Sequence, residues 1–78
     1  MAQRILIADD SEEIIEILQI LLTGEGYEVV TAGDGEEAVR LADDTIDLII
    51  LDVMMPVKSG YVACSEIRKK TMAPILFL

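Results

Sequence analysis

The sequence predicts an α/β fold built on a parallel sheet, and three observations support this. Short continuous apolar runs recur along the 78 residues, and two of these runs end directly in aspartates. Stretches with apolar residues at helical spacing separate the runs, and the connections between them are short. Buried parallel strands that alternate with crossover helices produce this pattern. The expected order of elements is therefore βαβαβαβ, with right-handed crossovers.

The first strand and the first helix have the clearest patterns. Residues 5–8 form a continuous apolar run that is expected to be a buried strand. Residues 11–23 are expected to form a helix, because five apolar side chains recur there at helical spacing: Ile14, Ile17, Leu18, Leu21 and Leu22. Either Asp10 or Ser11 can cap the start of this helix, and acidic residues in its first turn favour its positive end.

The next strand and helix are bounded by turn residues. Gly24 and Gly26 are expected to end the first helix. Residues 27–31 are rich in β-branched and aromatic side chains and are expected to form the second strand. A second helix is expected to begin at Asp34-Gly35 and to end near Asp43-Asp44.

The rest of the chain is expected to add a strand, a helix and a final strand. Residues 48–51 form a third buried apolar run, which ends at Asp52. Residues 61–70 are expected to form a helix whose last basic residues match its negative C-terminal end. Tyr61 is expected to pack beneath this helix, and residues 74–78 are expected to form the fourth strand.

Composition and charge exclude several classes of function. The chain has 15 acidic and 6 basic residues and a net charge of −9, so we do not expect it to bind nucleic acid directly. Its single cysteine, Cys64, permits no intrachain disulfide, which suits a reducing compartment. No apolar stretch reaches the roughly 20 residues that a membrane span requires. We therefore expect a cytoplasmic protein without a membrane segment.

Three aspartates follow the ends of two predicted strands. Asp9 and Asp10 come directly after the first strand, and Asp52 comes directly after the third. If the strand order is 2-1-3-4, an order known from other open parallel sheets, the first and third strands are neighbours and the three carboxylates converge. Converging carboxylates repel one another unless a cation binds, and hard oxygen ligands suit Mg²⁺. One carboxylate can then act as a nucleophile toward a phosphoryl group.

Two linked motifs resemble those of bacterial two-component response-regulator receiver domains. Residues 5–10 resemble the opening strand and acidic pair of these domains, and residues 48–56 resemble their phosphoacceptor strand and loop. Gly60 stands eight residues after Asp52, as in the family. The resemblance covers the whole chain and implies a flavodoxin-like sheet. The segment around Asp52 and residues 74–78 are most similar to regulators with a winged-helix DNA-binding output domain.

The resemblance also implies roles for single residues. Asp52 would be the phosphoacceptor, and a partner histidine kinase would be the donor, since this chain contains no histidine. The expected Mg²⁺ ligands are Asp10, Asp52, the backbone carbonyl of Met54 and, through a metal-bound water, Asp9. Pro56 and Gly60 would shape the loop after Asp52. The chain would be a phosphoacceptor module and not an enzyme, beyond promoting its own phosphorylation and dephosphorylation.

The resemblance also predicts what this chain lacks. Receivers carry a Thr or Ser just after the fourth strand and a Lys after the fifth, and both positions would lie beyond Leu78. Residues 1–78 are therefore expected to be the N-terminal two-thirds of such a domain, without the fourth helix, fifth strand and fifth helix, and switching is expected to be impaired. We further expect a homodimer that covers the bared sheet face or the apolar fourth-strand edge.

Two other functions are open alternatives. The chain could be a non-signalling receiver fragment that serves as a folding or self-assembly unit. It could also be a Mg²⁺-dependent phosphatase-like enzyme, although such enzymes usually carry an acid two residues after the nucleophile, where this chain has Met54. A G-x-G-x-x-A pattern at residues 33–38 formally matches a dinucleotide fingerprint. Because it follows the second strand and its acids would repel a pyrophosphate, we expect only a capped surface helix there.

Overall fold

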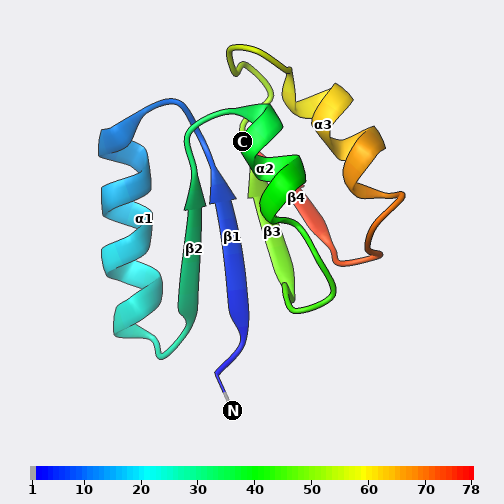
Figure 1. Cartoon of the computed structure of the whole chain (residues 1–78). Coiled ribbons are helices and arrows are strands. Elements are labelled where there is room, and N and C mark those ends of the chain that lie inside the picture. The colour runs from blue at the N-terminus through cyan, green and yellow to red at the C-terminus, as the bar shows by residue number, and fades with distance from the viewer. Residues whose placement is uncertain (1) are drawn as a thin grey trace.

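The structure, a computed structural model, describes residues 2–78, and that part of the chain contains four strands and three helices. The strands are β1 (Arg4–Ala8), β2 (Glu28–Ala32), β3 (Leu48–Leu51) and β4 (Ile75–Phe77). The helices are α1 (Glu12–Gly24), α2 (Gly35–Leu41) and α3 (Gly60–Ile67). Strands and helices alternate along the chain (Figure 1), which confirms the predicted order βαβαβαβ.

All neighbouring strands are parallel, and their order across the sheet is β2-β1-β3-β4. The expected flavodoxin-like arrangement is thereby confirmed. β1 and β3 lie side by side in the centre, with Ile5 opposite Leu48 and Ala8 opposite Leu51. This register brings the carboxyl ends of the two central strands together, which is the edge where sheets of this type bind ligands.

The sheet has a helix layer on each face (Figure 1). Alternate residues of the strands supply the two cores. One core joins the sheet to α2 and α3 through Leu6, Ala8, Ile49, Leu51, Ala38, Ala63 and Ile67. The other joins it to α1 through Ile5, Ile7, Ile50, Ile15, Leu18 and Leu22. Because both faces are covered, β3 is apolar along its whole length and β1 is apolar from Ile5 to Ala8, and no alternating pattern marks them.

The ends of α1 follow the predicted signals closely. Ser11, one of the two candidate caps, accepts a hydrogen bond on its hydroxyl from the backbone N–H of Ile14 at 3.4 Å. The helix runs through Gly24, and Gly26 then adopts a positive φ of 91°. The sequence thus placed both ends of α1 to within one residue.

The last helix is shorter than predicted, because α3 ends at Ile67 and not at residue 70. Two of the three basic residues expected to match the C-terminal end of this helix bond to carbonyls outside it. Arg68 donates from its side chain to the carbonyls of Thr71 (3.3 Å) and Ala73 (2.7 Å) in the following loop. The ammonium of Lys70 instead donates to carbonyls in the last turn of α2, those of Val39 and Arg40. These basic side chains therefore join separate segments.

α1 carries two apolar stripes, and only one of them packs on the sheet. The packed stripe consists of Ile15, Leu18 and Leu22. The exposed stripe consists of Ile14, Ile17 and Leu21, which are 40, 55 and 61% exposed. The spacing that predicted the helix mixed residues of both stripes. Both sets have equal helical spacing, so periodicity alone does not determine which one faces the core.

Tyr61 does not pack beneath α3, so that prediction is wrong. Its side chain is 64% exposed and stacks at a tilt against Phe77 of β4, with 5.3 Å between ring centroids. The first turn of α3 points this residue along the sheet edge, while the buried positions of the helix are occupied by the small residues Gly60 and Ala63 and by Ile67.

Within residues 2–78, no helix is both long and apolar enough to cross a membrane.

Candidate functional site

Three aspartates meet at the carboxyl edge of the central strands. Asp9 and Asp10 follow β1, and Asp52 follows β3. Hydrogen bonds extend the sheet to these residues, since the N–H of Asp52 donates to the carbonyl of Ala8 at 2.9 Å. One carboxylate oxygen from each of the three aspartates lies within 4.8 Å of the other two. The predicted convergence of the three side chains is therefore present in the folded chain.

Backbone N–H groups orient two of the three carboxylates. Asp9 accepts on Oδ1 from the N–H of Ser11 at 2.9 Å, and Asp52 accepts on Oδ1 from the N–H of Met54 at 3.1 Å. Each aspartate thus bonds to the residue two positions further on, an arrangement that begins a turn. For Asp52, the backbone bond from Met54 is on Oδ1 and not on Oδ2.

The cluster is electrostatically unfavourable without a cation. Asp9 is 6% exposed, Asp52 is half-buried and Asp10 is exposed. Burial raises the pKa of Asp9, repulsion from Asp52 and Asp10 raises it further, and the hydrogen bond from Ser11 partly offsets these effects. Within residues 2–78, no lysine or arginine pairs with any of the three: the ion pairs there are Arg4–Glu28, Arg40–Glu37 and Lys58–Glu66.

These donors fit a hard divalent cation. Mg²⁺ prefers oxygen ligands, few carboxylates and several retained waters. The cluster offers three carboxylates of graded exposure, so a bound ion can contact protein on one side and keep water on the other. Met54 stands two residues after Asp52 and is exposed, and its N–H bonds to Oδ1 of Asp52, which places its backbone beside the site. That its carbonyl is a ligand stays a prediction.

The loop from Asp52 to α3 closes tightly on itself. A Cβ built on Gly60 would lie only 2.2 Å from the carbonyl oxygen of Asp52, so no side chain fits there. The N–H of Gly60 also donates to the carbonyl of Val53 at 2.9 Å. Pro56 is exposed at the outer bend of this loop. Both loop-shaping positions named from the sequence thus lie in the same closed loop, and Gly60 closes it.

Two features of this loop had no clear signal in the sequence. Val57 has a positive φ of 69°, and the N–H of Lys58 donates across it to the carbonyl of Pro56 at 2.7 Å. This is a tight γ-turn in a conformation that a β-branched residue rarely adopts. Gly35 at the start of α2 packs directly against the backbone of Lys58. The sequence predicts only a capped surface helix at Gly35, whereas this residue is buried.

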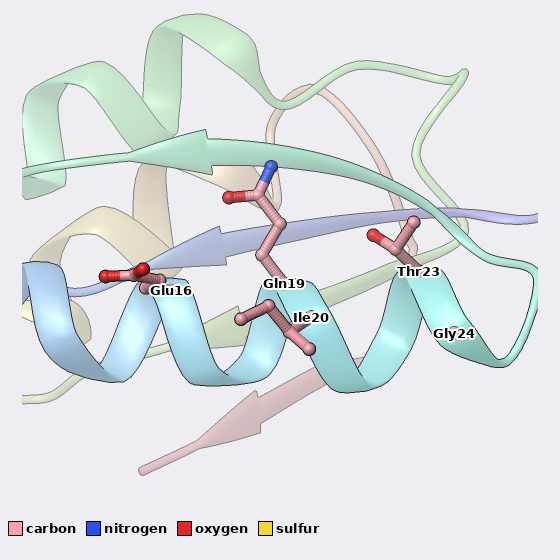
Figure 2. A pocket seen from close by; sticks show the side chains of 5 residues that line it. All are labelled: Glu16, Gln19, Ile20, Thr23 and Gly24. Atoms are coloured by element: carbon pink, nitrogen blue, oxygen red, sulfur yellow. The ribbon is translucent and has the colours of Figure 1, made fainter.

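The hollow drawn in Figure 2 has none of the three aspartates in its lining. Residues of α1 alone line it: Glu16, Gln19, Ile20, Thr23 and Gly24. They follow helical spacing along one side of α1 and include a single carboxylate. No group of residues there offers paired catalytic or metal-binding side chains, so the acidic edge is the candidate site.

Comparison with known proteins points to one family. Residues 5–78 match the family described as response regulator receiver domain. The chain is 51% identical over 78 residues to the uncharacterized transcriptional regulatory protein YrkP of Bacillus subtilis, covering all of this chain and 34% of that protein. It thus spans about a third of the length of the curated relatives that it matches.

Two solved structures share the fold. The receiver domain of the hybrid histidine kinase CckA superimposes with a TM-score of 0.90 at 40% identity, over 95% of this chain and 72% of that one. The receiver domain of the sensor histidine kinase PA1611 from Pseudomonas aeruginosa gives a TM-score of 0.91 at 33% identity, over 99% and 66%. The latter structure is described as having a magnesium ion coordinated in its active site cleft.

Proposed function

This chain belongs to the response regulator receiver domain family of two-component systems, and we propose that it accepts a phosphoryl group on Asp52. The observation that carries this proposal is the meeting of three carboxylates at one sheet edge, without a cationic partner in residues 2–78. We assign the nucleophile to Asp52, because it is half-buried, its Oδ1 is oriented by the N–H of Met54, and residues 48–56 resemble the phosphoacceptor segment of the family.

The proposed reaction is a phosphoryl transfer from a phosphohistidine of a partner kinase. A carboxylate oxygen of Asp52 attacks phosphorus in line with the departing imidazole nitrogen. A P–O bond forms and the P–N bond breaks, while the nitrogen keeps the electron pair and takes up a proton. The product on this chain is an aspartyl phosphate. The donor histidine lies outside these 78 residues, because they contain no histidine.

A Mg²⁺ site in the same cluster supports this chemistry. Asp10, Asp52 and the backbone carbonyl of Met54 are the proposed direct ligands, and Asp9 would hold a metal-bound water. When bound, Mg²⁺ supplies positive charge that neutralises the carboxylates and the transferred phosphoryl oxygens. The chain itself orients the acids: the N–H groups of Ser11 and Met54 hold Asp9 and Asp52 in place.

We propose that these residues form the phosphoacceptor part of a longer signalling protein, corresponding to the N-terminal two-thirds of a receiver domain. The coverage of 72% and 66% of two solved receivers supports this. Relatives described as transcriptional regulators suggest a DNA-binding output, although this acidic chain is not expected to contact DNA itself. We expect the chain to take up phosphate with a weakened conformational response.

Phosphate uptake from a small acyl phosphate tests the function directly. Incubating the chain with acetyl phosphate and Mg²⁺ should add one acid-stable, base-labile phosphoryl group, detected by mass spectrometry of the intact protein. A chelator of Mg²⁺ should prevent the addition. A folded chain that gains no phosphoryl group under these conditions, at any Mg²⁺ concentration, would contradict the proposal.

A second property, self-association, is favoured by a specific surface. The exposed stripe of α1 and Leu76 of β4 lie on the same side of the sheet, because Leu76 pairs with Ile50, which packs on that side. Leu76 is 55% exposed, and β4 is an edge strand of an uncharged segment. Apolar patches and unblunted edges of this kind promote association. We propose that the 78-residue chain forms a two-fold dimer through this surface.

Sedimentation at micromolar concentration tests the dimer. Leu76→Glu should shift the chain to monomer, since it would bury charge in the proposed contact. Val62→Glu is the matched control: Val62 of α3 is 51% exposed and lies on the other face, so its substitution should leave the association unchanged. A strictly monomeric parent chain would disprove the dimer without affecting the proposed role of Asp52.

A further inference from the structure

The first residue of α2 contacts the loop that follows Asp52 in a way that only glycine permits. Gly35 is buried, and a Cβ built on it would lie 2.0 Å from the carbonyl oxygen of Lys58 and 2.9 Å from its carbonyl carbon. Both atoms belong to the backbone and cannot rotate away as a side-chain tip can. To reach even 3.0 Å, the carbonyl oxygen and the helix would have to separate by about 1 Å.

The helix is the fixed partner in this contact. Ala38 of α2 and Ala42 just beyond it are completely buried in the core between the sheet and α3. Asp34 caps the start of α2 by accepting from the N–H of Glu37 at 2.8 Å. At the other end, the ammonium of Lys70 bonds to carbonyls of the last turn. Because α2 is held at both ends and along its buried face, a side chain at position 35 would displace the loop.

The loop is the adjustable partner, and its conformation is strained. Val57 has a positive φ of 69° in a tight turn closed by the N–H of Lys58. Such a conformation persists only where the surroundings enforce it. Two contacts converge on Lys58: its backbone lies against Gly35, and its ammonium pairs with the carboxylate of Glu66 in α3. Lys58 is thus the residue through which both α2 and α3 contact the segment of residues 53–59.

We propose that Gly35 is a positioning residue for the acidic site: by lacking a side chain, it lets α2 hold the loop that carries the backbone of Met54. This inference rests on the proposed role of Asp52 and of the Met54 carbonyl in binding Mg²⁺ and accepting phosphate. The N–H of Met54 bonds to Oδ1 of Asp52 at 3.1 Å, so a shift of the loop alters the nucleophile as well as the metal site. Misplacement of reacting groups by about 1 Å can slow a reaction on the order of 100-fold.

Gly35→Ala is the direct test, with Gly33→Ala as the matched control. Gly33 lies two residues earlier, and a Cβ built on it meets nothing within 4 Å. Its N–H, which bonds to the carboxylate of Glu37 at 2.9 Å, is kept in the alanine variant. We expect Gly35→Ala to weaken Mg²⁺ binding and to slow phosphate uptake from acetyl phosphate at least tenfold, on the scale of a lost outer-shell contact to a metal site. Gly33→Ala should match the parent chain in both.

A loss of stability must be separated from a loss of positioning. Mg²⁺ affinity is therefore read from amide shifts of the folded molecules alone, and the rate of phosphate uptake is measured at saturating Mg²⁺. Leu22→Ala, which weakens the core on the α1 face, serves as a destabilised control and should keep the parent affinity. In Gly35→Ala, the amide signals of Met54 and Lys58 should be displaced even without Mg²⁺.

A second variant decides the matter if Gly35→Ala does not fold. Glu66→Gln removes the charge that holds Lys58 from the α3 side and leaves the packing of α2 unchanged. It should weaken Mg²⁺ binding several-fold, in the same direction. Parent-like Mg²⁺ affinity and uptake in every folded variant of this pair would overturn the inference. If the parent chain and Gly33→Ala themselves take up no phosphate, the proposed function has failed, and that result is distinct from a failure of the role of Gly35.

Discussion

Both ends of the parallel sheet carry aspartates, but the groups that surround these side chains differ between the two ends. At the amino end, Asp47 accepts from the backbone N–H of Arg4 at 2.8 Å. Asp43 accepts from the N–H and the hydroxyl of Thr45, and the side chain of Arg4 donates to that hydroxyl. The bonds from Thr45 lower the pKa of Asp43, so its charged form is favoured in the folded chain.

At the carboxyl end, Asp9, Asp10 and Asp52 face one another without a cation among residues 2–78. Burial and repulsion raise the pKa of Asp9, the opposite of what happens to Asp43. Aspartates at the amino end therefore stabilise a loop, whereas those at the carboxyl end form a site that a ligand can complete. The difference lies in their partners, since both ends are made of the same residue type.

The largest expected effect comes from neutralising one aspartate at each end of β3. Asp52→Asn should abolish phosphate uptake from acetyl phosphate, because asparagine keeps the shape and removes the nucleophilic carboxylate. Asp47→Asn, just before the same strand, should leave uptake at the parent level. Intact-protein mass spectrometry measures both. Acyl phosphate still forming on Asp52→Asn would show that another residue is the acceptor.

Metal affinity should separate the two ends next most strongly. Mg²⁺ should bind the parent chain weakly, since few protein ligands are available and the ion keeps its waters. Asp10→Asn removes a proposed direct ligand and should lower affinity by at least the roughly 10–100-fold that loss of an outer-shell partner costs. Asp43→Asn should leave affinity unchanged. Amide-shift titration provides the measurement, and equal affinities in all three chains would disprove the site.

The sequence predicted the acidic edge well, because that prediction needed local patterns and one strand order known from other parallel sheets. Apolar runs located β1 and β3, and the known strand order then placed Asp9 and Asp52 together. The contact between Gly35 and Lys58 was not predictable in this way, because it joins segments far apart in the chain at a spacing of atoms that no periodicity encodes. The end of α3 at Ile67 was not predictable from local patterns either, because Lys70 bonds to a carbonyl of α2, which is far away in the sequence.

A smaller effect is expected at the amino end on changing Arg4. Arg4→Ala removes a half-exposed side chain that bonds to Thr45 and lies 3.5 Å from the carboxylate of Glu28. Solvent screens such contacts, so the loss should be about 1 kcal/mol of unfolding free energy, the scale of one net hydrogen bond. Urea unfolding provides the measurement. A change in Mg²⁺ affinity on this substitution would mean that the two ends are coupled.

The smallest expected effect is the acid dependence of stability that Asp43 contributes. Its folded pKa lies below its ordinary value of 3.8, so the unfolded chain binds the proton more readily. The stabilisation is present above that ordinary value and is lost as pH falls through the folded pKa. With Asp43→Asn, the free energy of unfolding should therefore fall less steeply as pH drops through this acidic range. At higher pH, its pH dependence should match that of the parent chain. An unchanged slope there would show that Thr45 does not favour the charged carboxylate.

The most direct test of the central claim is to locate the phosphoryl group within the chain. After reaction with acetyl phosphate and Mg²⁺, borohydride reduces an aspartyl phosphate to homoserine, and peptide mass spectrometry identifies the modified position. Modification at Asp52, and none at Asp43 or Asp47 of the opposite sheet end, is the predicted result. Modification of an aspartate outside the carboxyl edge, or of several aspartates equally, would contradict the assignment of Asp52 as the phosphoacceptor.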